Sequence, residues 1–107
     1  MDSEILYKRI CTGFDKNTYL EYYIIPESIS AAYCDLKCYG IKVVETTIYE
    51  GGGKTIDIKQ INNVFYREQD AADFAESAAK KQIRPPELRT YMENYILEGL
   101  DRAKQKA

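Results

Sequence analysis

Residues 41–62 read IKVVETTIYEGGGKTIDIKQIN, and this stretch decides the fold. Before the three glycines, β-branched residues dominate residues 41–50, which is typical of a strand. After the glycines, apolar and polar residues alternate over residues 54–62, which indicates a second strand with two different faces. The triple glycine at 51–53 allows a tight turn between the two strands. The stretch therefore predicts a β-hairpin.

The same glycines, followed by Lys54 and Thr55, also end like a phosphate-binding loop. That motif requires a further glycine at position 48, where this chain has Ile48. It also requires a helix directly after the loop, because the amides of the helix N-terminus hold the phosphates. The strand pattern continues instead, so a hairpin turn is the better interpretation.

The residues before the hairpin predict three more strands, at 4–12, 18–25 and 32–38. We expect Pro26 to end the second of them, because proline cannot donate a hydrogen bond to a neighbouring strand. We expect Gly40 to mark a bulge or bend before the hairpin. Both faces of the second strand are largely apolar or aromatic, which indicates that one face is covered and the other is partly covered or used for contact.

After the strands, the hydrophobic period changes. Alanine and phenylalanine recur at helical spacing over residues 67–82, which predicts a helix with a small-residue stripe. The prolines at 85–86 break the chain, and a second helix is predicted at about 86–104. Leu97 falls opposite the apolar face of this second helix, as a weak indication of a partner.

Strands first and helices last predict an α+β fold. The 107 residues have room for a single domain, residues 1–107. In this domain an antiparallel sheet of four to five strands, built from hairpins, occupies residues 1–62. The two C-terminal helices occupy residues 67–104 and pack on one face of the sheet.

The charge and the N-terminus bear on partners and location. The net charge of −2 does not favour broad nucleic-acid binding, which draws on a basic surface. No run of about 18 apolar residues is present, so we expect no membrane span. The N-terminus carries Asp2 and Glu4 where a secretory signal would be basic, and we expect a cytoplasmic protein.

The cysteines and the missing histidine bear on chemistry. An odd set of cysteines indicates free thiols in a reducing compartment, and we expect Cys11, Cys34 and Cys38 to be buried small side chains. Because the chain has no histidine, Ser-His and Cys-His catalytic pairs cannot form. We therefore expect no enzyme, no metal and no cofactor. The carboxylate pairs left as candidates to meet across strands are Glu45 with Asp57 and Asp35 with Glu50.

Several features follow one another in an order that resembles a known family. They are the YGIKVV motif at 39–44, the glycines at 51–53, the alanine-bearing helix, and the proline turn at 85–86 leading into Leu88. Over residues 39–100 the chain resembles a family of short uncharacterised bacterial proteins, a domain of unknown function. The resemblance implies a small accessory protein and supplies no site residues.

The function that these observations favour is stoichiometric protein–protein binding without catalysis. The 10 tyrosines combine a large apolar ring with a polar tip, which suits a contact surface. In size and composition the chain is similar to phage or mobile-element proteins that inhibit host defence enzymes, such as anti-CRISPR proteins. The candidate partner-binding residues are Tyr19, Tyr22, Tyr23, Tyr33 and Tyr49.

An alternative function is a small-ligand or nucleotide-binding module, with a homo-oligomer that forms the pocket between copies. Basic residues gather in sequence around the junction of the two predicted helices, where they could hold an anion beside tyrosines that stack on bases. The candidate anion-binding residues are Lys80, Lys81, Arg84 and Arg89.

Overall fold

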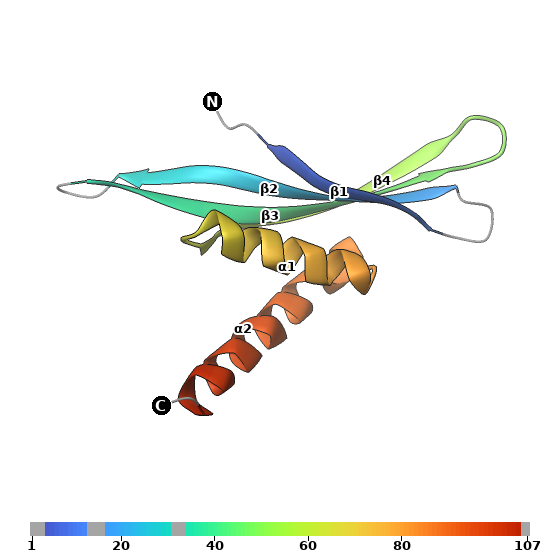
Figure 1. Cartoon of the computed structure of the whole chain (residues 1–107). Coiled ribbons are helices and arrows are strands. Elements are labelled where there is room, and N and C mark those ends of the chain that lie inside the picture. Colours follow the sequence, from blue (N-terminus) through green and yellow to red (C-terminus); the bar gives the residue numbers. More distant parts are fainter. Residues whose placement is uncertain (1–3, 13–16, 31–33, 106–107) are drawn as a thin grey trace.

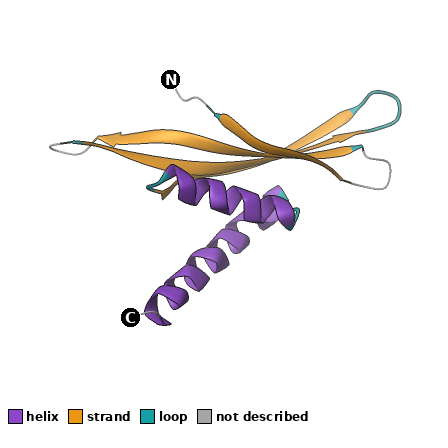
Figure 2. Ribbon diagram, in the orientation of Figure 1, coloured by secondary structure: helices purple, strands orange, loops and turns teal. Residues whose placement is uncertain are grey.

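The computed structural model describes residues 4–12, 17–30 and 34–105. Within them the chain forms a single antiparallel sheet in which each strand pairs with its sequence neighbour, in the order β1-β2-β3-β4. Two α-helices and a short 3-10 helix follow, and both α-helices lie on the same side of the sheet (Figures 1 and 2). The predicted α+β fold is confirmed. The elements are β1 (Ile5–Thr12), β2 (Thr18–Ser30), β3 (Asp35–Ile48), β4 (Lys54–Phe65), α1 (Glu68–Lys80), η1 (Pro85–Glu87) and α2 (Leu88–Gln105).

The glycine turn joins β3 to β4 as the sequence predicts. Gly51 and Gly52 have φ angles of 92° and 95°, in the left-handed region that side chains disfavour. The amide of Tyr49 donates to the carbonyl of Gly53 at 2.7 Å and closes the turn. The chain continues from Lys54 as strand and not as helix, so the glycines form a hairpin turn and not a phosphate-binding loop.

Gly40 lies inside a strand and not between two strands. The described parts of the predicted strands at 32–38 and 41–50 lie in one continuous β3, Asp35–Ile48, so the described sheet has four strands. The predicted irregularity is present on the β4 side, where the register shifts between Tyr39 and Ile41. A Cβ atom at position 40 would lie 2.7 Å from the carbonyl oxygen of Ile61. The bulge therefore depends on a close backbone approach that only glycine permits.

The prediction that Pro26 ends its strand is wrong. β2 continues to Ser30, and Pro26 pairs with Tyr39 of β3. On the other side of β2, the described pairing with β1 stops at Ile24. A strand that has a neighbour on one side only can accommodate proline, because no hydrogen bond is required on the open side.

The core lies between the sheet and α1. β2 contributes the fully buried Leu20 and Tyr22, and α1 contributes Phe74 together with an alanine stripe. The small alanines allow the helix to lie close to the strands. Phe74 occupies the centre of an aromatic cluster, with ring centroids 5.7, 5.5 and 5.0 Å from those of Phe65, Tyr91 and Tyr95.

α2 packs only through its first turns. Leu88 is fully buried and Met92 is 4% exposed, so the start of the helix belongs to the core. The helix then leaves the sheet and points away from it (Figure 1). From Ile96 onward it carries three exposed apolar side chains, Ile96, Leu97 and Leu100.

The cysteines differ from the prediction in burial. Cys38 is buried, whereas Cys11 and Cys34 are exposed, so two of the three are not core residues. None of the three is in a disulfide. Among the described helices, none combines the length and apolar character needed to cross a membrane.

Candidate interaction surface

The two faces of the sheet differ in what covers them. Residues directly opposite one another on paired strands share a face, and successive residues alternate. Tyr22 pairs with Val43, and both are fully buried beneath the helices. Their neighbours Glu21 and Val44 pair on the opposite face. We call the first the helix-side face and the second the open face, because neither α-helix lies over it (Figure 2).

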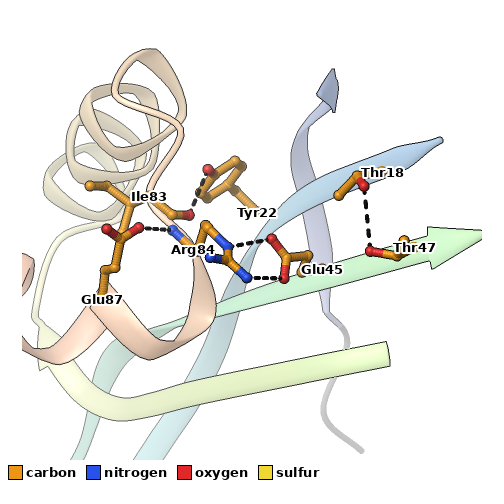
Figure 3. A network of polar contacts seen from close by, with 7 residues as sticks. All are labelled: Thr18, Tyr22, Glu45, Thr47, Ile83, Arg84 and Glu87. Carbon is orange, nitrogen blue, oxygen red and sulfur yellow. Dashed lines mark hydrogen bonds and ion pairs between the residues drawn. The ribbon is translucent and has the colours of Figure 1, made fainter. Parts of the chain in front are cut away.

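A polar network fastens the segment between α1 and η1 to the helix-side face (Figure 3). Arg84 reaches Glu45 of β3 with two hydrogen bonds, Nε to Oε2 at 2.7 Å and Nη2 to Oε1 at 3.0 Å. The backbone amide of Arg84 donates to Glu87 Oε1 at 2.9 Å. The hydroxyl of Tyr22 donates to the carbonyl of Ile83 at 2.8 Å. The segment is therefore held by a bidentate ion pair and a partly buried hydrogen bond.

Tyr22 belongs to this network, and its prediction as a partner-binding residue is wrong. The ring is fully buried. Alternation along the strand distinguishes two faces but does not say which one the helices cover. Burial raises the pKa of Tyr22 far above that of a free tyrosine, and the negative charges of Glu87 and Glu45 raise it further. The hydroxyl therefore remains a donor to Ile83.

This raised pKa makes the stability of the protein fall in alkali. The contribution of neutral Tyr22 is constant below about pH 10 and declines by about 1.4 kcal/mol per pH unit above it, because only the unfolded chain can ionise readily.

We expect Tyr22→Phe to cost about 1 kcal/mol at neutral pH by leaving the Ile83 carbonyl unpaired. Because phenylalanine does not ionise, the variant should lose less stability than wild type in alkali. Urea unfolding from about pH 8 to about pH 11 measures the difference. Tyr66→Phe, at an exposed tyrosine, is the control; parallel curves for wild type and Tyr22→Phe would contradict the assignment.

The open face carries an apolar patch over β2, β3 and β4. Val44 pairs with Ile58, and Thr46 pairs with both Tyr19 and Ile56. The isoleucines of the patch are large and half exposed, with exposed fractions of 44% for Ile48, 53% for Ile56 and 54% for Ile58. We define the open-face patch as Tyr19, Val44, Ile48, Ile56 and Ile58, of which Val44 is only 9% exposed.

Charged and polar groups from β1, β2 and β3 border the patch. The Arg9 guanidinium lies 5.0 Å from the centre of the Tyr19 ring, and the Lys42 ammonium lies 5.3 Å from that of Tyr23. The Tyr23 hydroxyl donates to Glu21 Oε2 at 3.1 Å. These contacts hold both tyrosines in place on the strand. An apolar centre with a polar rim is the usual composition of a protein-binding surface.

The other predicted tyrosines lie elsewhere. Tyr49 is 51% exposed beside the hairpin turn, where its hydroxyl is 3.3 Å from Thr55 Oγ1, and it is not part of the open-face patch. Tyr33 lies outside the described residues. Sequence reasoning missed the isoleucines of the patch, because alternation makes them look like ordinary core residues of a strand. The signal available in the sequence was that the strands contain more isoleucine than two helices can cover.

The four predicted anion-binding residues do not form one site. Arg84 is engaged by Glu45, and Lys80 is exposed at the end of α1. Lys81 lines a pocket of about 200 Å³ with Tyr91, and its ammonium lies 5.5 Å from the Tyr91 ring. Arg89 lines a separate groove of about 300 Å³ between β4 and the other side of α2.

Of the two predicted carboxylate pairs, one lies directly opposite across two strands and the other does not. Glu45 and Asp57 are directly opposite on β3 and β4, but Arg84 neutralises Glu45. Asp35 pairs with Ser30 at the far end of β3, away from Glu50. Over the described part of the chain, no group of three or more acidic or cysteine side chains could hold a metal ion.

A comparison with protein families matches residues 1–98 to the family of unknown function DUF6514. The chain belongs to that family. The match extends the predicted resemblance, which covered residues 39–100, over the N-terminal hairpin of the sheet. Neither the curated proteins nor the solved structures contain a match. The functional assignment for this DUF6514 member therefore depends on its own surfaces.

Proposed function

We propose that the protein is a non-catalytic interaction module that binds another protein stoichiometrically through the open-face patch. The observation that supports this most is the exposure of Ile56 and Ile58 on one face of β4, with the exposed Ile48 of β3 diagonal to Ile56. Contiguous exposed apolar side chains with a polar border are typical of protein contact sites. The strands hold these side chains in place before binding, which lowers the entropic cost of association.

The helix-side face offers no such surface. Its central apolar residues pack against α1 and the first turns of α2, and the segment between α1 and η1 is held by Arg84 and Tyr22. A partner that binds the open face can therefore associate without disturbing the core. We place this activity in the cytoplasm, on the support of three cysteines that are not in disulfides.

Inhibition of a host defence enzyme by a phage or mobile-element protein is one specific form of this function. Its support remains the small size and the composition of the chain. The alternative, a small-ligand or nucleotide module, has less support because Arg84 is engaged by Glu45 and the other cations are apart.

Two matched substitutions test the patch. Ile56→Glu places a charge on the open face, and Leu97→Glu places the same charge on α2 at a similar exposure, 53% against 58%. We expect wild-type protein, tagged and expressed in its native cell, to recover one partner in stoichiometric amount. Ile56→Glu should reduce that recovery at least about tenfold, because the charge must be desolvated in an apolar contact. Leu97→Glu should recover the partner like wild type.

Quantitative mass spectrometry of the captured material provides the measurement. Circular dichroism checks that both variants are folded, and an exposed substitution of this kind usually changes stability by under about 0.5 kcal/mol. The proposal fails if wild type recovers no stoichiometric partner, or if both variants recover it equally.

A further inference from the structure

The two edge strands of the sheet differ in how they could meet another strand. An edge strand presents unpaired N–H and C=O groups that can pair with a further strand. β1 has a register shift between Leu6 and Lys8, followed by the adjacent cations Lys8 and Arg9. A bulge opposes pairing at an edge, and like charges destabilise a pair when they lie opposite each other. β4 pairs with β3 without a shift from Lys54 to Ile61, and it contains no proline.

The regular part of β4 is also uncovered. Residues 54–58 and Gln60 are exposed, and Lys59 is partly exposed. α2 approaches only the later part of the strand, where Ile61, Asn63 and Val64 line the groove with it. Residues 54–60 therefore form a regular and accessible edge.

The charges along this edge favour a second copy of the same chain. We propose that two copies pair antiparallel through β4, with the two-fold axis at Ile58. In this register Asp57 of each copy lies opposite Lys59 of the other, so two oppositely charged pairs form. An axis at position 57 would place Asp57 opposite itself, and an axis at position 59 would do the same for Lys59. Opposite charges stabilise a directly facing pair and like charges destabilise it, so the sequence selects the axis at Ile58.

The pairing has a further consequence on the open face. Ile58 lies opposite Ile58 of the second copy, and Ile56 lies opposite Gln60. The two four-stranded sheets become one continuous sheet, and the two open-face patches meet across the new contact. This inference concerns the edge of the sheet and does not depend on the proposed partner binding.

Charge exchange on the purified full chain tests the register. Sedimentation velocity over a concentration series should show wild type in a monomer–dimer equilibrium. Asp57→Lys and Lys59→Asp should each weaken self-association about tenfold or more, because each turns both attractive pairs into repulsive ones. An equimolar mixture of the two variants should restore the dimer, because every cation then faces a carboxylate in the mixed pair. The double variant D57K/K59D should dimerise alone like wild type.

Asp73→Lys makes the same charge change on the exposed surface of α1 and should leave the dimer unchanged. The double variant keeps the test decisive if one single variant is poorly folded. A wild type that stays monomeric at all concentrations overturns the proposal. So does a dimer that neither single substitution weakens, or a failure of both the mixture and the double variant to associate. None of these results depends on the capture experiment with Ile56→Glu.

Discussion

Phe74→Ala is expected to lower the free energy of unfolding by about 3–5 kcal/mol, the cost of removing a large buried aromatic side chain. Phe74 is fully buried, and its ring contacts Phe65 from β4 and both Tyr91 and Tyr95 from α2. The cavity would lie where the sheet, α1 and α2 meet. Because a domain has only about 5–15 kcal/mol of stability, the loss would be a large fraction of the total.

Urea unfolding followed by circular dichroism measures this loss. Tyr66→Ala, at an aromatic residue that is 68% exposed, is the matched control and should change stability by less than about 0.5 kcal/mol. A loss under about 1 kcal/mol for Phe74→Ala would mean that the cluster collapses around the cavity or does not hold α2.

Gly40→Ala is expected to cost about 3 kcal/mol, at the upper end for overpacking. The added Cβ would lie 2.7 Å from the Ile61 carbonyl oxygen and 3.1 Å from Asn62 Cα. Both atoms belong to the backbone, so β4 must move away from β3 where the bulge lies. Amide hydrogen exchange should therefore accelerate in β3 and β4 near the bulge, beyond the loss of global stability.

Gly99→Ala provides the opposite control for the same chemical change. Apart from its chain neighbours and the nearby backbone of its own helix, a Cβ at position 99 meets no atom within 4 Å, and the residue lies inside α2. Alanine is the better helix former, so this variant should gain up to about 1 kcal/mol. Equal effects of Gly40→Ala and Gly99→Ala in urea unfolding would contradict the close approach at the bulge.

Local features of the fold could be predicted from the sequence because short-range chemistry determines them. The glycines at 51–53 are compatible with a tight turn wherever the flanking strands lie, and the alanine stripe of α1 repeats at helical spacing. Gly40 was correctly predicted as an irregularity. The prediction for Pro26 is wrong, because whether β2 can contain proline there depends on where β1 ends. No residue near Pro26 indicates where that is.

The candidate surface was harder to predict, because it depends on long-range arrangement. Tyr22 and Tyr23 are adjacent and chemically identical, yet one is in the core and the other is on the open face. The covering helices decide between them, and those helices lie far along the chain. The ion pair of Arg84 with Glu45 spans 39 residues, so Arg84 looked like a free cation in the sequence. Only the tertiary structure shows that its charge is already neutralised.

The meander order of the sheet has a consequence for how the chain folds. Every strand pairs with its neighbour in sequence, so each hairpin can close over a short loop at a small entropic cost. The contacts between residues far apart in the sequence lie on the helix-side face, where the Tyr22 hydroxyl donates to the carbonyl of Ile83, 61 residues later. Local contacts form faster than distant ones, so the hairpins should assemble first and the helices should dock last. During synthesis the strands also leave the ribosome before α1. The apolar residues of the helix-side face then remain exposed to water until the helices emerge. During this interval the nascent chain is most prone to aggregate.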